Sequence, residues 1–333
     1  MACLDQIHTE KYSLYNGDCL AVMSEMPDKS IDFSIYSPPF CALYTYSSDV
    51  RDLSNSRDYE EFMAHYELVV SEIARLTKPG RVTAVHAMDI PDSCNLGNFL
   101  SDFPGDIIRL HEKLGMKYIA RHHIWKEPLG VRNRTMAKGL AHKTVCVDST
   151  LCDVAGADYL LCFRKEGKND VPVSHERGLY DYFGEDQPPA ELRQFRGMEG
   201  DQKLNRWSHH IWRRYASSSW HDIRLGYVLP YKEARDQDDE RHVHPLQRDV
   251  IARAIELRSN PGEVVFTPFM GVGSEVYQAV AMGRRAFGAE LKPSYFRQAV
   301  KNLETVGDVI PEQDDMPLFN GVDEHGGCHS DIL

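Results

Sequence analysis

Two short stretches of this 333-residue chain carry residue types and spacings that suit chemistry. The first, residues 266–274 (FTPFMGVGS), contains Gly271 and Gly273, which would let the backbone approach a bound ligand closely. It is neither a complete G-x-G-x-x-G, because Val276 replaces the third glycine, nor a phosphate-binding loop with G-K-[ST]. Glu290 ends the next apolar run, where a carboxylate can accept hydrogen bonds from two ribose hydroxyls. Together these features favour a nucleotide-type ligand over a plain turn and a solvated acid.

The second stretch is Ser37-Pro38-Pro39-Phe40, directly after an apolar run. Two prolines end a strand and leave carbonyl oxygens without local donors. The Ser37 hydroxyl and the Pro38 carbonyl could accept hydrogen bonds from one exocyclic amine while Phe40 stacks on its ring. Such an amine is a poor nucleophile, and two acceptors would favour a pyramidal nitrogen whose lone pair points at an electrophilic methyl group. Taken alone, the stretch is better explained as an ordinary Pro-Pro turn.

The surrounding segments predict alternating strands and helices. Apolar runs predict strands at residues 31–36, 81–86, 118–125, 159–163, 264–266 and 286–289. Helical spacing predicts helices from residue 58 to a stop at Lys78-Pro79-Gly80, over 244–258 and over 275–282. This order implies an α/β fold with a doubly wound, mostly parallel sheet and helices on both faces.

Periodicity fades between residues 131 and 240, where proline, glycine and charge accumulate. We therefore expect four units along the chain. These are a catalytic half at 1–130, an inserted target-recognition domain at 131–240, a cofactor-binding half at 241–306 and an acidic, disordered tail at 307–333.

The net charge of −12 is unevenly distributed. From residue 302 onward there are eight acids and no Lys or Arg, whereas seven basic residues stand against one acid between 117 and 145. A second basic stretch, 193–224, is interleaved with Trp207, Trp212, Tyr215 and Trp220. Basic groups with interleaved aromatics suit phosphates and unstacked bases, although a solvated surface with core aromatics gives the same pattern.

The remaining composition argues against other classes of protein. No apolar run approaches the ~20 residues that span a bilayer, and charges occupy the place of a signal-peptide core, so we expect a cytoplasmic protein. Eight cysteines include no C-x-x-C pair, so we expect free thiols. The paired histidines at 122–123 and 209–210 would face opposite sides of a strand, and we expect no metal site.

These motifs resemble the S-adenosylmethionine-dependent DNA amino-methyltransferases in the β arrangement. In that family a [DNS]-P-P-[YF] element precedes the target-recognition region, and an F-x-G-x-G cofactor element follows it. The resemblance covers roughly half of the chain, at residues 15–127 and 244–303. It implies S-adenosylmethionine as cofactor, double-stranded DNA as partner and a target base flipped out of the duplex.

The resemblance also implies roles for individual residues. The catalytic residues would be Ser37, Pro38, Pro39 and Phe40. The cofactor-binding residues would be Asp18, Cys19, His244, Thr267, Pro268, Phe269, Gly271, Gly273, Ser274 and Glu290. We expect the DNA backbone to be contacted by Arg121, Lys126, Arg132, Arg134, Lys138 and Lys143. The segment 313–319 (QDDMPLF), with Gln313 and Phe319 at its ends, resembles peptides that dock bacterial sliding clamps, although a solubilising tail is the favoured interpretation.

The chain departs from the family pattern at two positions, and the base that it would methylate has more than one candidate. Thr267 stands where the family has Asp, which removes a carboxylate from the cofactor side, and Arg248 replaces a usual Lys. Ser-Pro-Pro-Phe resembles the members that methylate N4 of cytosine, as in restriction-modification systems, with N6 of adenine as the alternative. An RNA methyltransferase and an inactive DNA-binding module are the further alternatives.

Overall fold

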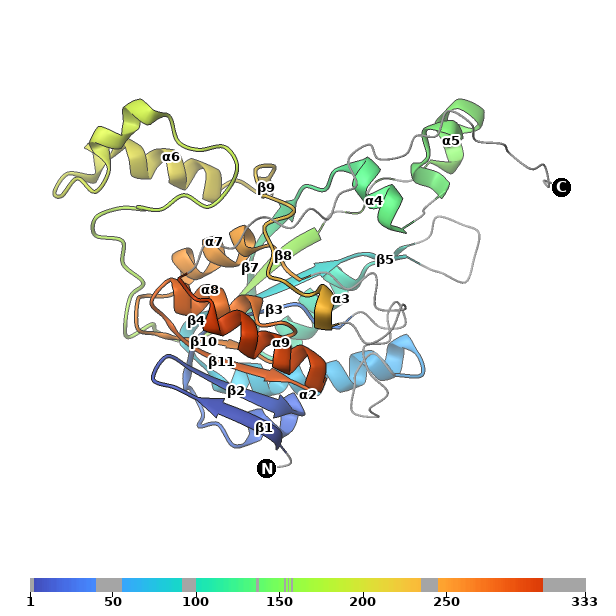
Figure 1. Cartoon of the computed structure of the whole chain (residues 1–333), viewed down its shortest axis with the longest axis horizontal. Coiled ribbons are helices and arrows are strands. Elements are labelled where there is room, and N and C mark those ends of the chain that lie inside the picture. Colours follow the sequence, from blue (N-terminus) through green and yellow to red (C-terminus); the bar gives the residue numbers. More distant parts are fainter. Residues whose placement is uncertain are drawn as a thin grey trace.

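A single mixed sheet of nine strands forms the centre of the computed structural model (Figure 1). The structure describes residues 3–39, 56–91, 100–135, 138–152, 154, 156, 158–234 and 245–307. The strands are β1 (Cys3–His8), β2 (Tyr12–Gly17), β3 (Ile31–Tyr36), β4 (Thr77–Met88), β7 (Met116–Ile124), β8 (Asp158–Lys165), β9 (Ser219–Trp220), β10 (Val264–Thr267) and β11 (Arg285–Glu290), with β5 (Ile90–Pro91) and β6 (Leu100–Ser101) as a separate pair.

Helices cover both faces of this sheet. The helices are α1 (Cys19–Ser24), α2 (Tyr59–Leu76), α3 (Phe103–Lys113), α4 (Pro128–Thr135), α5 (His142–Val147), α6 (Arg206–Tyr215), α7 (Arg248–Arg258), α8 (Ser274–Ala281) and α9 (Pro293–Glu304). Short 3₁₀ turns lie at Lys138–Leu140, Ser149–Leu151, Ala190–Phe195, Gln202–Leu204 and Lys232–Ala234. One core packs α1, α2 and α3 on the sheet, and the other packs α7, α8 and α9 on the opposite face (Figure 1). The predicted α/β class is confirmed.

Sheet order brings distant segments of the chain together. The order is β1-β2-β11-β10-β3-β4-β8-β7-β9, and the run from β2 through β4 is parallel. In a parallel sheet the loops after successive strands emerge at one edge. The loops after β3 and β10, more than 200 residues apart in sequence, therefore leave the sheet side by side.

The segment 131–240 contributes β8 and β9 to the central sheet, with β8 antiparallel to both β4 and β7. Its role as a target-recognition domain stays a prediction. The helix expected from residue 244 begins at Arg248, because Gln247 is still extended (ψ 132°) and the Arg248 amide bonds the Tyr227 carbonyl. His244 lies outside the described residues.

Within the described parts, no helix is long and apolar enough to cross a membrane.

A buried arginine fastens the 182–222 segment to α7. Arg253 is fully buried, its Nη2 lies 2.8 Å from Asp222 Oδ2, and its Nε donates to the Phe183 carbonyl. The rings of Tyr182, Tyr215 and Trp220 surround its guanidinium. Removing one partner of a buried pair leaves an uncompensated charge, at a cost of about 3–5 kcal/mol.

We therefore expect Arg253→Met to lower the free energy of unfolding by about 3–5 kcal/mol in urea titrations. Because the loss comes from the stranded Asp222 carboxylate, adding Asp222→Asn should recover part of it. A single variant that loses under ~1 kcal/mol would show that this ion pair does not hold the segment.

Candidate active site

Ser37 lies at the carboxyl end of β3, between β4 and β10. All six residues of β3 are buried, and Tyr36 pairs in register with Val85 of β4, so Ser37 follows beside His86. Pro38 is buried and Pro39 is half-buried. Phe40 lies outside the described residues. The serine hydroxyl is thus held at the edge where the strand-end loops meet.

A line of four polar side chains starts at this serine. Ser37 Oγ lies 2.9 Å from His86 Nδ1, and His86 Nε2 lies 2.8 Å from Asp158 Oδ2. The same carboxylate oxygen is 2.7 Å from Lys126 Nζ. Burial alone would raise the pKa of Asp158, but Lys126 and His86 bring it well below its usual range, so this carboxylate is ionised. The four residues come from the ends of β3, β4, β8 and β7, which are neighbours in the sheet.

Tyr36 connects this serine to the glycine-containing loop. Its ring meets Phe269 edge-on with 5.9 Å between centroids, and its hydroxyl bonds that of Tyr66 at 3.1 Å. Burial raises the pKa of Tyr36 far above its usual range, so the phenol stays neutral. The predicted catalytic and cofactor stretches are therefore in direct contact through Tyr36 and Phe269.

The loop between β10 and α8 requires its glycines. Gly273 caps α8 in the left-handed region (φ +90°), and a Cβ there would lie 3.0 Å from that of Ala299. Gly271 also has positive φ (+55°), and a Cβ there would meet nothing within 4 Å, so space is open beside it. Asn302 of α9 fixes the loop by donating to the Val272 carbonyl. The backbone at Gly271 is thus accessible to a ligand.

Glu290 closes this loop from the end of β11. Its two carboxylate oxygens accept hydrogen bonds from the amides of Gly271 and Lys292, each at 2.8 Å. Asn16 holds the strand end by donating to the Glu290 and Leu291 carbonyls. An ionised carboxylate has about four lone-pair sites, so it keeps capacity for further donors.

Asp18 and Cys19 lie at the adjacent start of α1. The Asp18 carboxylate caps this helix by accepting from the Leu20 amide. Cys19 is buried, and burial together with Asp18 and Glu290 raises the pKa of its thiol far above the usual range. The thiol is therefore protonated and offers packing rather than charge to this site.

Three buried polar side chains lie around the loop. Two of them, the hydroxyls of Thr267 and Ser274, have no hydrogen-bond partner among the described residues. Glu275, in the first turn of α8, is 5% exposed, and burial with a smaller effect of Glu290 raises its pKa to about 8. Buried polar atoms without partners are typical of a site that a polar ligand completes.

The basic residues expected on DNA occupy different environments. Arg121 is exposed on β7 with its guanidinium over Tyr159, and Lys143 is exposed on α5. Arg132 is half-buried on α4, while the side chains of Arg134 and Lys138 lie outside the described part. The Lys126 side chain is 8% exposed and paired with Asp158, which argues against its expected contact with the DNA backbone.

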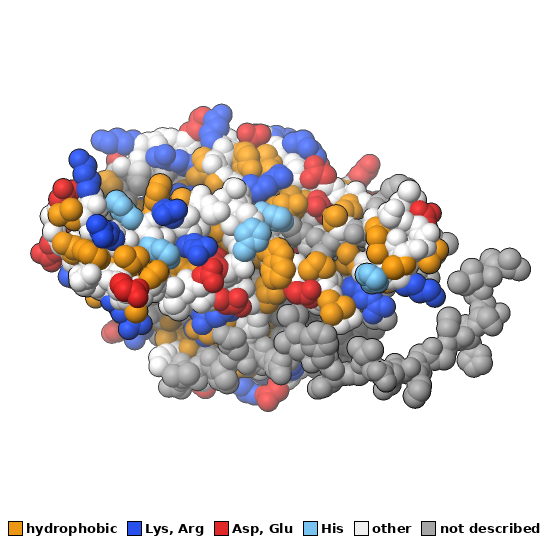
Figure 2. Space-filling model, turned by 90° about the horizontal axis from the view of Figure 1, so that it is seen from above, with side chains coloured by type: hydrophobic (Ala, Val, Ile, Leu, Met, Phe, Trp, Pro, Cys, Tyr) orange, Lys and Arg blue, Asp and Glu red, His pale blue; other side chains and the backbone are white. Residues whose placement is uncertain are grey.

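Helices α4 and α5 project from the side of the sheet where β5 lies, whereas α6 lies at the other end of the molecule (Figure 1). Seen from above in Figure 2, this face of the molecule carries Lys and Arg side chains that are spread across it and interspersed with acidic ones. The exposed residues of α6 include Arg206, Trp212 and Arg213. The second basic stretch is therefore displayed on the surface, away from α5.

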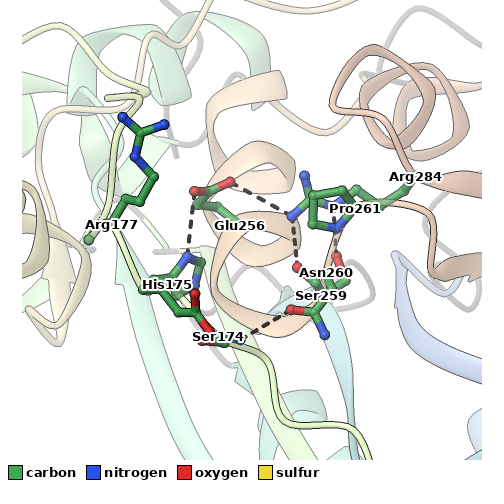
Figure 3. Close-up of a pocket in the computed structure, with 10 residues that line it drawn as sticks. Ser174, His175, Arg177, Glu256, Ser259, Asn260, Pro261 and Arg284 are labelled. Atoms are coloured by element: carbon green, nitrogen blue, oxygen red, sulfur yellow. Dashed lines mark hydrogen bonds and ion pairs between the residues drawn. The ribbon is translucent and has the colours of Figure 1, made fainter. Parts of the chain in front are cut away.

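A cavity of about 310 Å³ lies at the amino ends of β10 and β11 (Figure 3). Glu256 points between His175 Nδ1, at 3.9 Å, and Arg284 Nη2, at 3.8 Å. Arg284 also donates to the Ser259 carbonyl, and Asn260 accepts from the Ser174 amide. These contacts join segment 174–178 to the end of α7, and none of the residues expected in the active site lines this cavity.

Sequence reasoning missed His86, Asp158 and Glu275. The first two were visible as polar residues at the ends of predicted strands, a position from which side chains reach a strand-end site. Their position next to Ser37 follows from the order of the strands in the sheet, which the sequence does not show. Glu275 reads as an ordinary acid in a first helical turn, where the helix dipole favours negative charge.

Comparisons with known proteins agree with this architecture. A family model described as DNA methylase, N6_N4_Mtase, matches residues 31–301. The type II methyltransferase M.BglII of Bacillus subtilis is 23% identical over 291 residues, which make up 85% of this chain and 66% of M.BglII. The chain thus spans about two thirds of the length of that relative.

Two solved structures share the fold. A protein described as a DNA modification methylase from Thermus thermophilus, in complex with S-adenosyl-L-methionine, superposes with a TM-score of 0.58 at 20% identity, covering 90% of this chain and 96% of that one. PvuII DNA methyltransferase (cytosine-N4-specific) gives 0.56 at 14% identity, covering 90% and 91%. Because the family model covers most of the chain and the predicted motifs meet at one sheet edge, the protein belongs to the N6/N4 DNA methylase family.

Proposed function

We propose that the protein transfers a methyl group from S-adenosylmethionine to the exocyclic amine of a base flipped out of double-stranded DNA, with N4 of cytosine favoured over N6 of adenine. The observation that carries this proposal is the contact between the Ser37 loop and the glycine loop through Tyr36 and Phe269. An amine held by the first loop then lies next to a cofactor held by the second. Positioning of this kind replaces strong base catalysis as the main source of rate.

The residues around the glycine loop fit S-adenosylmethionine. Glu290 would accept the ribose hydroxyls, the open space at Gly271 would admit the nucleoside, and the unpartnered Thr267 and Ser274 hydroxyls would bond its polar groups. Phe269, half-buried, offers a ring face to a cation, a contact worth ~0.5–2 kcal/mol. When bound, this cofactor supplies a methyl group on a positively charged sulfur.

Ser37 and the Pro38 carbonyl would accept the two hydrogens of the amine. A serine hydroxyl, unlike the Asp of related motifs, also donates one hydrogen bond. In the structure, the residue next to the Ser37 hydroxyl is His86. The Ser-Pro-Pro-Phe sequence supports N4 of cytosine. Phe40 would stack on the flipped base.

Exposed Arg121 and Lys143, with Arg132, would track the phosphate backbone from β7, α4 and α5. We extend this role to Arg134 and Lys138, and we assign Lys126 to the active site instead. The similarity to type II methyltransferases supports a restriction-modification role. The tail, including the clamp-like segment 313–319, lies outside the described residues.

The test is incubation with isotope-labelled S-adenosylmethionine and genomic DNA that carries no modified bases, followed by digestion and separation of the nucleosides by mass. Label in N4-methylcytosine is the expected result. Label in N6-methyladenine keeps the enzyme class and overturns the choice of base. Label in RNA alone, or cofactor binding without transfer to any nucleic acid, overturns the proposal.

Cofactor binding should depend on Glu290. We expect Glu290→Gln to weaken S-adenosylmethionine binding about 10- to 100-fold by calorimetry, because hydrogen bonds to a charged group contribute about 1.5–3 kcal/mol. Glu304→Gln, the same change at an exposed acid that ends α9, is the matched control and should bind normally. Equal affinity of both variants would remove Glu290 from the cofactor site.

A further inference from the structure

The two ring nitrogens of His86 lie within hydrogen-bond distance of different residues. Nε2 faces the Asp158 carboxylate and Nδ1 faces the Ser37 hydroxyl. An ionised carboxylate only accepts hydrogen bonds, so Nε2 carries the proton of the neutral ring. Nδ1 is then an acceptor, and the hydrogen bond with Ser37 has one direction, from Oγ–H to Nδ1.

This direction determines what Ser37 can offer a substrate. Because its own proton points at His86, the lone pairs of Oγ are free to accept from an amine. The hydroxyl therefore acts as an acceptor, as the proposed function requires. It also connects the amine to a basic nitrogen one hydrogen bond further along.

Resting on the proposed function, we propose that His86 is a positioning residue that orients the Ser37 hydroxyl and receives, through it, the proton that the amine must lose. When the amine lone pair forms its bond to the methyl carbon, the carbon–sulfur bond breaks and its electron pair stays on sulfur. The nitrogen then carries one proton in excess. That proton passes to Ser37 Oγ as the Ser37 proton passes to His86 Nδ1, which leaves serine neutral and His86 an imidazolium.

Asp158 and Lys126 set how strongly His86 holds this proton. The carboxylate stabilises the imidazolium, and Lys126, 2.7 Å from the same oxygen, offsets part of that charge. This assigns a function to a nearly buried lysine that would otherwise be only half of an ion pair.

Charged groups on the helices that pack against β4 have partners of their own. His86 alternates with Ala84 and so lies on the face of the sheet that α7 covers. From α7, Arg253 pairs with Asp222 and Asp249 pairs with Arg224. On the opposite face, the buried His111 of α3 bonds the Ile107 carbonyl. Within the described residues, the side chains shown in polar contact with the imidazole are therefore those of Ser37 and Asp158.

The first test measures methyl transfer in a single turnover, with cofactor and DNA both bound. His86→Asn offers an acceptor oxygen near the position of Nδ1 but cannot take up a proton, and we expect the rate to fall about 10²-fold. Cofactor affinity and the unfolding midpoint should change little. His8→Asn, the same change at an exposed histidine on β1, is the matched control and should retain the full rate.

Two readouts separate this role from a structural one. Free imidazole should restore His86→Ala at least tenfold, because it can occupy the vacated space, and it should not restore Ser37→Ala. Lys126→Met should move the half-maximal rate to higher pH, because loss of the cation leaves the imidazolium more stable beside Asp158. A structural role predicts neither effect.

The two proposals fail in different ways. If the unchanged protein methylates DNA while His86→Asn keeps its rate within threefold, the role of His86 is overturned and the proposed function stands. If His86→Asn is slow but imidazole does not restore His86→Ala and Lys126→Met leaves the pH profile unchanged, proton uptake by His86 is overturned. If the unchanged protein methylates no DNA, both proposals are overturned.

Discussion

Replacement of Ser37 by alanine is expected to lower the single-turnover rate of methyl transfer at least about 10²-fold. The variant loses the acceptor that would orient the amine and the hydroxyl that would link that amine to His86. Cofactor binding should persist, because Glu290 and the Gly271 loop are held by separate contacts. The measurement is rapid-quench transfer of labelled methyl groups at saturating DNA.

Ser30→Ala is the matched control for this experiment. Ser30 precedes β3 at its opposite end, and its buried hydroxyl has no hydrogen-bond partner in the part of the chain that the structure describes. The same hydroxyl group is removed from the residue that flanks the other end of β3, without a change at the carboxyl edge. We expect full activity from Ser30→Ala, and a Ser37→Ala protein as fast as this control would contradict the proposed role of the serine.

The second large effect concerns stability and pH. Glu275 has a pKa of about 8 in the folded protein, raised by burial and the nearby Glu290, against about 4.5 when unfolded. The folded state therefore binds the proton more tightly, so the contribution of this group is fully present below pH 4.5 and is lost as the pH rises to 8. At about 1.4 kcal/mol per unit, the total loss is on the order of 5 kcal/mol.

Glu275→Gln should remove this pH dependence, because the amide resembles the protonated acid and does not ionise. We expect the variant and the unchanged protein, without ligands, to have similar free energies of unfolding near pH 4.5. At pH 8, urea titrations should give the variant a free energy of unfolding several kcal/mol higher than that of the unchanged protein. Glu304→Gln should track the unchanged protein. A constant difference between Glu275→Gln and the unchanged protein across this range would mean that the carboxyl is not buried in solution.

The sequence predicted those parts of the site that depend on local rules. Residues 31–36 form β3 as expected, because an apolar run that meets two prolines has few other options. The loop at Gly271 and Gly273 was also predictable, since both residues have positive φ, a conformation that glycine adopts without strain. The contact between these two stretches was expected only from the resemblance to a family.

Features that depend on sheet order could not be predicted in this way. Residue 158 begins a strand that lies between β4 and β7, although the surrounding sequence has the composition of an irregular insertion. Without that placement, Asp158 has no relation to His86, and Lys126 reads as one more cation in a basic stretch. The buried environment of Glu275 likewise arises from packing rather than from its position in a helix.

The pairing of β3 with β10 has a consequence for synthesis of the protein. Asp32 on β3 accepts the Val264 amide across this seam, but about 230 residues separate the two strands. At a synthesis rate of roughly 5–20 residues per second, β10 is made on the order of ten seconds or more after β3. Until then, one edge of β3 has no strand to pair with. Unpaired edges recruit other chains, and inward-facing charges such as Asp32 discourage this. The carboxylate that joins the two halves of the sheet in the finished protein would therefore also oppose such pairing while the chain is being made.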